Sequence, residues 1–417
     1  MKRRKFFKTI GLGSLAAFPQ VKMPGALIGH ETPPRPASEA HGHMDPWIDV
    51  NLDHVRWNFS QIKNLVKVPV MAVIKANAYG HGLIDVGKAL EKAGADWLMV
   101  GNLQEGLALR ATGVRCPILN FGPFNARDCE AIILNNLSQS VFSEEAVTLN
   151  DTASRLKKRA LVHIDIDTGM SRTGIPHDRA LPLIEKIAIL SQTKIEGVST
   201  TLTEDAGFDK EQLERFLKVC RSAQKKKIQL GLKHAASSAG IFESAELYLD
   251  MVRPGITLYG YYPNSQTQKE DRLNLRPALK LTAKVTVITD LQPGDSISYH
   301  RVFTARKKMR VATVGIGYSD GYAPQLGGKG IVLIRGKRFP VMDAVTANHI
   351  IADLNNDQEI QVGDDVTLID GRKDSGLTAD RLADLSGISD YRILIGLNPL
   401  VQRKYTSPTG LMRTSRL

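Results

Sequence analysis

The chain contains little cysteine and few aromatic residues. Its 417 residues include three cysteines, Cys116, Cys129 and Cys220, and only 6% of its residues are Phe, Trp or Tyr. Because the cysteines are odd in number, scattered and without metal-ligand spacing, they exclude a disulfide framework and indicate no metal site. Basic residues do not alternate with aromatic ones, so the net charge of +12 indicates a basic N-terminal address segment and solvated surface rather than nucleic-acid binding.

The N-terminus lacks a hydrophobic run long enough to form a stable membrane anchor. Five of the positive charges lie before residue 9, and a mild apolar stretch, Thr9–Phe18, follows them. Ten residues are too few to span a bilayer, and the pair Arg3-Arg4 before such a stretch resembles a twin-arginine export signal. We expect residues 1–20 to be this signal and residues 21–46 to be a flexible linker. The protein would then be exported to the periplasm or cell envelope; a disordered basic tail is the alternative.

Short apolar runs alternate with amphipathic helical patterns from about residue 69 to residue 260. The expected strands are Pro69–Ile74, Trp97–Gly101, Pro117–Phe121, Ser138–Phe142, Leu161–Ile166, Ile195–Ser199, Leu232–His234 and Val252–Leu258. The expected helices include Ile84–Ala93, Gln104–Ala111, Ala180–Ser191 and Lys210–Lys225. Eight strand–helix units of this length predict a (β/α)8 TIM barrel, which we assign to residues 47–275.

The pattern changes after about residue 275, where strand-rich segments are separated by glycine-rich turns. The expected strands are Leu281–Ile288, Val311–Ile316, Ile331–Ile334 and Asp365–Ile369, and one short helix is expected at Thr378–Leu385. Residues 276–417 are therefore predicted to form a mainly β C-terminal domain, so that the chain as a whole belongs to the α/β class.

A lone lysine stands at the end of an expected buried strand. The apolar run Val70–Ile74 ends in Lys75, and a glycine-bounded turn, Tyr79–Gly82, follows. Burial of an amine is costly and lowers its pKa, and a neutral amine can form a Schiff base with an aldehyde. The alternative is a lysine whose side chain extends from the strand end into solvent. Spacing alone leaves both interpretations open, although catalytic groups of TIM barrels do lie at the C-terminal ends of strands.

The same residues resemble those of a known family. Val73–Gly82, Val-Ile-Lys-Ala-Asn-Ala-Tyr-Gly-His-Gly, is similar to the pyridoxal-phosphate motif of alanine racemases. Further motifs follow in the family's order at Asp167–Gly174, Val252–Gly255, Leu258–Gly260 and Gly317–Tyr322. The resemblance covers roughly residues 47 to 405. The chain resembles periplasmic broad-spectrum amino-acid racemases more than alanine-specific enzymes in three features: the export signal, the segment Gly169–Arg172, and Pro399 where the family usually has tyrosine.

The resemblance implies a homodimeric, pyridoxal-phosphate-dependent racemase that interconverts L- and D-amino acids by two-base proton transfer at the α-carbon. Lys75 would hold the cofactor and act as one base, and Tyr318 of the partner subunit would act as the other. The residues that the resemblance assigns to cofactor binding are Lys75, Tyr79, Ser238, Arg253, Gly255 and Ile256. Arg172 and Ala347 would contact the amino-acid substrate.

Four positions depart from the family pattern. Thr201 stands where the family usually has histidine, and Asp165 where it has a lysine. Ala347 and Pro399 stand where it has methionine and tyrosine, and their smaller volume predicts that larger amino acids than alanine are accepted. Thr201 keeps open the alternative of a catalytically weakened cofactor-binding or amino-acid-binding homologue. Another barrel-type pyridoxal-phosphate enzyme, such as a decarboxylase, is the second alternative, and the Tyr318 loop argues against it.

Overall fold

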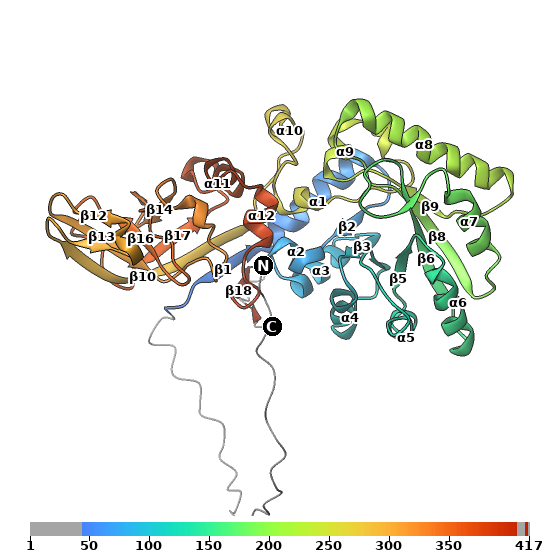
Figure 1. Cartoon of the computed structure of the whole chain (residues 1–417), viewed down its shortest axis with the longest axis horizontal. Coiled ribbons are helices and arrows are strands. Elements are labelled where there is room, and N and C mark those ends of the chain that lie inside the picture. The colour runs from blue at the N-terminus through green and yellow to red at the C-terminus, as the bar shows by residue number, and fades with distance from the viewer. Residues whose placement is uncertain (1–43, 407–412, 416–417) are drawn as a thin grey trace, which may run out of the picture. The chain divides into compact units, whose positions relative to one another are not determined.

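A computed structural model describes residues 44–406 and 413–415 of the chain (Figure 1). The expected export signal, residues 1–20, and nearly all of the expected linker, residues 21–46, lie outside the described residues. Within the described part of the chain, no helix has both the length and the apolar character that crossing a membrane requires.

Parallel strands form the first sheet. In spatial order they are β2 (Met71–Val73), β3 (Trp97–Val100), β4 (Ile118–Asn120), β5 (Ser138–Val141), β6 (Ala160–Asp167), β8 (Thr193–Ser199) and β9 (Leu232–His234), with β7 (Ile175–Pro176) beside β6. The helices on their outer side are α3 (Leu83–Lys92), α4 (Leu103–Ala111), α5 (Cys129–Leu134), α6 (Glu145–Arg155), α7 (Ala180–Ala188) and α8 (Ala206–Lys225) (Figure 1). Buried Val, Ile and Leu side chains fill the space between the two layers, so the predicted barrel is confirmed.

The segment around Val252 closes the ring of strands. The backbone N–H of Met71 donates to Val252 O at 2.8 Å, and the N–H of Arg253 donates to Ala236 O at 2.8 Å. The prediction of a strand over Val252–Leu258 is wrong beyond this point, because Ile256–Tyr259 is a 3-10 helix. Pro254 has no N–H group to continue a ladder, and the next residue, Gly255, turns the chain at ψ −93°.

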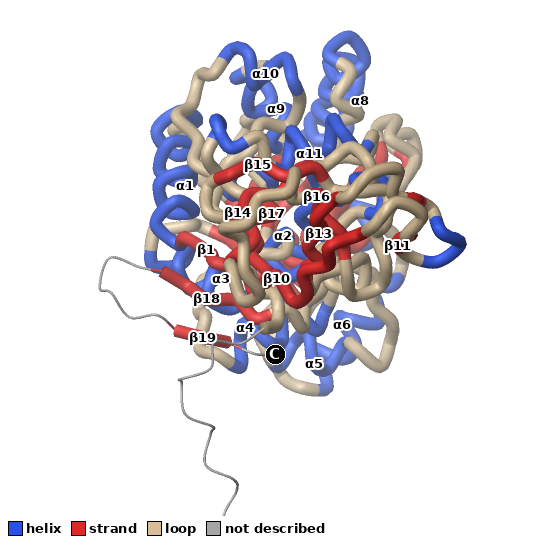
Figure 2. Tube along the Cα trace, turned by 90° about the vertical axis from the view of Figure 1, so that its left-hand side faces the viewer, coloured by secondary structure: helices blue, strands red, loops and turns tan. Residues whose placement is uncertain are grey.

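The second sheet is mainly antiparallel, and it forms the predicted mainly β domain. Its strands are β1 (Trp47–Asn51), β10 (Leu279–Leu291), β13 (Met309–Val314), β14 (Ile331–Ile334), β15 (Lys337–Pro340), β16 (Ile350–Asp353), β17 (Asp365–Ile369), β18 (Gln402–Thr406) and β19 (Arg413–Ser415) (Figure 2). A separate small hairpin pairs β11 (Ser296–Ile297) with β12 (Phe303–Thr304). Strand β1 precedes the barrel in sequence but pairs with β10 and β18, so the second sheet is built from both ends of the described chain.

The remaining helices connect or cover these sheets. They are α1 (Leu52–Val66), α2 (Lys75–Tyr79), α9 (Ser238–Glu243), α10 (Ser265–Glu270), α11 (Ala379–Ser386) and α12 (Asp390–Ile395). Helix α11 corresponds to the predicted helix at Thr378–Leu385, whereas α12 was not predicted. Helix α12 contacts α2, and the buried guanidinium of Arg403 on β18 donates to Gly80 O at 3.1 and 3.2 Å. The second domain therefore supports the turn that follows Lys75.

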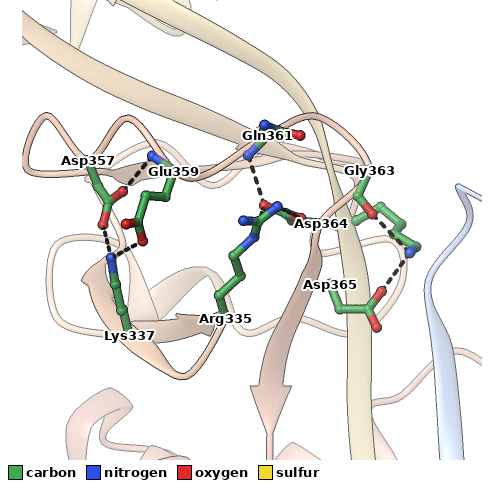
Figure 3. Close-up of polar contacts among 9 residues, drawn as sticks. Arg335, Lys337, Asp357, Glu359, Gln361, Gly363, Asp364 and Asp365 are labelled. Carbon is green, nitrogen blue, oxygen red and sulfur yellow. Dashed lines mark hydrogen bonds and ion pairs between the residues drawn. The ribbon is translucent and has the colours of Figure 1, made fainter.

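Exposed ion pairs tie a loop of the second domain to the β14–β15 hairpin (Figure 3). Lys337 Nζ lies 2.7 Å from carboxylate oxygens of both Asp357 and Glu359, and Arg335 Nε lies 2.8 Å from Asp364. Each exposed pair is worth only ~0–1 kcal/mol, so the cluster orders the loop more than it stabilises the fold.

Candidate active site

A cavity of about 410 Å³ opens at the C-terminal ends of the barrel strands. Its lining includes these residues predicted from the sequence: Lys75, Tyr79, Arg172, Ser238, Arg253 and Gly255. Ile256, the next residue along the chain, is buried. Residues from widely separated parts of the sequence thus meet where TIM barrels carry their catalytic groups.

Lys75 enters this cavity from an unusual turn. Directly after it, Ala76, Asn77 and Ala78 adopt left-handed backbone conformations with φ between 52° and 55°. Such a conformation costs roughly 1–2 kcal/mol for each non-glycine residue. The Glu105 carboxylate holds the turn, because it accepts hydrogen bonds from the N–H groups of Asn77 and Gly101, each at 2.9 Å. The strained backbone thus directly follows Lys75, and backbone strain of this kind is common at functional sites.

The surroundings of Lys75 favour its neutral form. Burial lowers the pKa of the Lys75 amine, the positive charge of Arg172 lowers it further, and Glu105 opposes both effects. A lowered pKa increases the fraction of uncharged amine near neutral pH, which is the form that reacts with a carbonyl group.

One end of the cavity offers hydrogen-bond donors to an anionic group. Tyr79 and Ser238 supply hydroxyl groups there, and the Ser238 hydroxyl accepts a hydrogen bond from the N–H of Gly255 at 2.9 Å. A Cβ atom at Gly255 would lie 2.5 Å from the Tyr79 hydroxyl oxygen, so only glycine allows this close approach. Tyr79 is held by stacking on Tyr259, with ring centroids 5.0 Å apart. Hydroxyl groups beside a glycine turn are well suited to a phosphate group.

Arg253 presents a fixed donor to the cavity. It is only 6% exposed, and Nη1 donates to His234 Nδ1 and His234 O, both at 2.7 Å. Nη2 donates to Thr200 O at 2.8 Å and to Ala235 O at 3.1 Å. These four bonds use both terminal nitrogens and leave the Nε–H group. Burial lowers the pKa of Arg253 to about 10, partly offset by Asp165, so the side chain stays charged at neutral pH and can only donate.

Asp165 lies buried at the end of β6, where the family resemblance had placed a lysine. Its carboxylate accepts hydrogen bonds from Ser199 Oγ at 2.9 Å and from Thr173 Oγ1 at 3.1 Å. Burial raises the pKa of Asp165, whereas these two hydroxyls and the charges of Arg253 and Arg172 lower it. Burial is the largest of these effects, so the pKa of Asp165 is raised on balance, and the two hydroxyl groups hold its side chain in place.

Two titratable residues of the cavity were not predicted from the sequence. Glu204 has a left-handed backbone with φ 66°, and burial together with Asp209 raises the pKa of its carboxyl group. Tyr391 comes from α12 of the second domain, and its ring centroid lies 5.8 Å from that of Tyr79. No local motif marks either residue, because each reaches the cavity only through tertiary packing.

Tyr318 and Ala347 are not part of this cavity. Tyr318 lies on a loop of the second domain and is 53% exposed. Its N–H donates to Thr346 O at 3.0 Å, and the N–H of Ser319 donates to Ala347 O at 2.9 Å, so the loop is braced although its tyrosine is exposed. Pro399 lines a different cavity of about 380 Å³ beside α2. One chain therefore supplies the lysine side of the site without the tyrosine.

These features define a class of enzyme. A TIM barrel carries a partly buried lysine, two hydroxyl groups beside a glycine turn and a buried arginine at the C-terminal ends of its strands, where enzymes of this fold carry their catalytic groups. Among the described residues, no group of three or more His, Cys, Asp or Glu side chains is placed to hold a metal ion.

The comparisons with known proteins agree with this class. Residues 50–263 match the family model for the alanine racemase N-terminal domain, and residues 278–405 match that for the C-terminal domain. The alanine racemase of Carboxydothermus hydrogenoformans is 36% identical over 365 residues, which are 86% of this chain and 99% of that protein. The chain belongs to the alanine racemase family of amino-acid racemases.

Solved structures show the same relationship. The alanine racemase of Clostridium difficile 630 superposes with a TM-score of 0.85 at 34% identity, covering 90% of this chain and 99% of that one. An alanine racemase from Bartonella henselae with covalently bound pyridoxal phosphate superposes with a TM-score of 0.76 at 26% identity, covering 87% of this chain and 99% of that one.

Proposed function

We propose that this protein interconverts L- and D-alanine with pyridoxal phosphate as its cofactor. The observation that carries the proposal is the meeting of Lys75, the Tyr79–Ser238–Gly255 cradle and Arg253 in one cavity. The residues fit the cofactor. Lys75 offers an amine for its aldehyde, the cradle offers hydrogen-bond donors for its phosphate, and Arg253 offers its Nε–H as a further donor. The covalently bound cofactor of the Bartonella henselae relative supports the same assignment.

Pyridoxal phosphate, when bound, supplies an electron sink that makes the α-proton of an amino acid acidic. Lys75 would hold the cofactor, and its amine, whose lowered pKa favours the neutral form, would take or return that proton. Tyr79, Ser238 and the backbone at Gly255 and Ile256 would hold the phosphate. Arg253 would offer its Nε–H to the cofactor and would keep its own proton. Arg172 attracts the substrate carboxylate by its charge.

The second proton-transfer group is Tyr318 of a partner subunit in a homodimer. Three observations support this role: the tyrosine is exposed, its loop is held by backbone hydrogen bonds, and it is absent from the cavity of its own chain. An exposed acid or base on a rigid loop is well placed to complete a neighbouring molecule's site.

The proposed substrate range includes amino acids larger than alanine. Its support is the small side chain of Ala347. The backbone carbonyl of Ala347 accepts a hydrogen bond from the N–H of Ser319 in the Tyr318 loop. Ala347 would therefore border the substrate when that loop enters the partner's site. In the test, purified protein is assayed with L- and D-alanine, lysine, arginine and methionine. We expect turnover of at least one larger amino acid, and Ala347→Met should narrow the range toward alanine. Strict preference of the wild type for alanine would refute this part of the proposal.

The proposed location is the periplasm or cell envelope, reached as a folded protein through the export signal at Arg3 and Arg4. The signal lies outside the described residues, so its support is the sequence alone. Replacement of both arginines by lysine should retain the protein inside the cell. Unchanged export of that variant would contradict the proposal.

Covalent trapping tests the cofactor assignment. Borohydride reduction of the purified protein, followed by peptide mapping, should place pyridoxyl phosphate on Lys75, and Lys75→Ala should abolish the label. Labelling of a different lysine would overturn the assignment. A trapped cofactor without turnover of any amino acid would instead favour the weakened homologue that Thr201, a residue of the cavity wall, suggests.

A further inference from the structure

Two fully buried histidines, His163 and His234, lie behind Arg253 inside the barrel. We propose that His163 is a positioning residue: it fixes the tautomer of His234 and thereby the orientation of Arg253 toward the cavity. The effect that we expect on cofactor binding rests on the function proposed above. The arrangement of the three side chains does not depend on that function.

The three side chains form one chain of hydrogen bonds. Arg253 Nη1 lies 2.7 Å from His234 Nδ1, and His234 Nε2 lies 2.9 Å from His163 Nδ1. His163 Nε2 is buried and has no hydrogen-bond partner among the described residues. The rings of the two histidines are 5.1 Å apart, and His163 also packs edge-on against Trp97.

The direction of these bonds follows from the arginine. An arginine side chain has donors only, so His234 Nδ1 must accept and cannot carry a proton. A neutral His234 then carries its proton on Nε2 and donates it to His163 Nδ1. His163 must in turn carry its own proton on Nε2. Each group thus donates to the next, and the chain has one self-consistent proton arrangement.

Burial keeps both histidines neutral. Desolvation, with the positive charge of Arg253 as the second cause, lowers the pKa of His163 to about 3. The same two causes lower the pKa of His234 far below its usual range. A second cation next to Arg253 is therefore avoided at physiological pH, and both rings act as hydrogen-bonding groups only. Asp165 and Arg172 are the other charged groups that act on Arg253.

A glycine makes this chain possible. His163 is on β6 and His234 is on β9, and strand β8 runs between them. The residue of β8 opposite His163 is Gly197. A Cβ atom there would lie 2.5 Å from His163 Nδ1, so any side chain would occupy the space in which the two rings meet. The fold thus leaves a gap in β8 through which His163 reaches His234.

Loss of the His163 acceptor should weaken the hold of His234 on Arg253. Without that acceptor, the buried Nε2–H of His234 has no partner, and a buried unpaired donor is costly. His234 can avoid this cost by moving its proton to Nδ1, but that proton would then oppose the N–H of Arg253. In that case the guanidinium loses its bond to His234 Nδ1 and keeps only its bonds to the carbonyl oxygens of Thr200, His234 and Ala235.

The first experiment needs no variant. ¹⁵N NMR of histidine-labelled wild-type protein at pH 7 reports which ring nitrogen is protonated, and His163→Asn and His234→Asn spectra assign the two signals. We expect both histidines to be neutral with the proton on Nε2. Protonation of Nδ1 in either ring, or a charged imidazolium, would overturn the proposal without bearing on racemisation.

The second experiment compares matched variants. In His163→Asn, the side-chain oxygen can replace Nδ1 as the acceptor, whereas in the similarly shaped His163→Leu a methyl group takes that place. We expect the Leu variant to bind pyridoxal phosphate at least tenfold more weakly and to shift the visible absorption band of the bound cofactor, and the Asn variant to retain both properties within about twofold.

Two results would contradict the proposal. If Asn and Leu are equally impaired, His163 acts by packing against Trp97 rather than by accepting a hydrogen bond. If neither variant differs from wild type, Arg253 does not need the chain. Should the Leu variant fail to fold, the NMR result alone decides. Failure of the wild type to bind pyridoxal phosphate would refute the proposed function and leave the tautomer assignment standing.

Discussion

At the scale of single residues, the cavity holds one group that opposes cofactor binding. The Glu204 carboxyl lines the cavity, and it has a hydrogen bond with Ser237, which precedes Ser238 of the phosphate cradle. Burial raises the pKa of Tyr79, and the charge of Glu204 raises it further. A negative charge there repels a phosphate dianion. The backbone of Glu204 is left-handed at φ 66°, so the residue occupies this place at a conformational cost.

Glu204→Gln should therefore strengthen pyridoxal phosphate binding. We expect a Kd about fivefold lower at pH 8, equivalent to ~1 kcal/mol of charge repulsion near a protein surface. The folded-state pKa of Glu204 is raised, so the carboxyl group becomes neutral as pH falls through that value, and the difference between wild type and variant should disappear at low pH. Titration of apoprotein with cofactor across pH 5–9 measures this. A Kd difference that stays constant with pH would contradict the electrostatic explanation.

Sequence reasoning found residues whose local pattern is unusual and missed those without one. Lys75 follows an apolar run, and Arg172, Arg253 and Gly255 lie in family motifs, and all four reach the cavity. Tyr391 could not be found this way, because it contacts Tyr79 only after the second domain packs on the barrel. The role of Tyr318 stays a prediction, because this exposed residue lies outside the cavity of its own chain.

At the scale of structural elements, the turn at Gly255 controls the phosphate end of the cavity. In Gly255→Ala, the added Cβ would lie 2.5 Å from the Tyr79 hydroxyl, so Tyr79 must move. We expect at least tenfold weaker binding of pyridoxal phosphate, because loss of one hydrogen bond to a charged group costs ~1.5–3 kcal/mol. Gly207→Ala in α8, where no backbone or ring atom crowds the added carbon, is the control and should bind normally. Equal affinity of both variants would show that Tyr79 does not hold the phosphate.

The positions of the strands and helices were easier to predict than the pairing of the strands with one another. Strand-rich segments separated by glycine-rich turns identified β14 and β17 with their observed bounds, because buried strands need no distant information to be recognised. Strand β1 pairs with β10, so that Trp47 lies opposite Thr282, and no local pattern predicts a partner so distant in the sequence. The strand predicted at Val252–Leu258 is reduced to a single bridge between Val252 and Val70, because the Pro254–Gly255 turn interrupts the apolar segment.

At the scale of the whole molecule, the account requires two subunits for each active site. Lys75→Ala and Tyr318→Phe homodimers should each be almost inactive, while Tyr318→Phe should still bind cofactor. Mixed dimers have one site with both wild-type groups, so mixing the inactive variants should restore up to about half of the wild-type activity per dimer. The measurement is racemase activity of mixed dimers verified by two different affinity tags. No recovery in verified mixed dimers would place both groups on one chain.

The most direct test of the central claim is α-proton exchange during alanine turnover. Wild-type protein, pyridoxal phosphate and L-alanine are incubated in D₂O, and chiral chromatography with mass spectrometry follows both enantiomers. The account predicts D-alanine formation until the two enantiomers are equal, with deuterium at the α-carbon of both, and no exchange in Lys75→Ala. Exchange without inversion, or L-alanine recovered without deuterium, would contradict it.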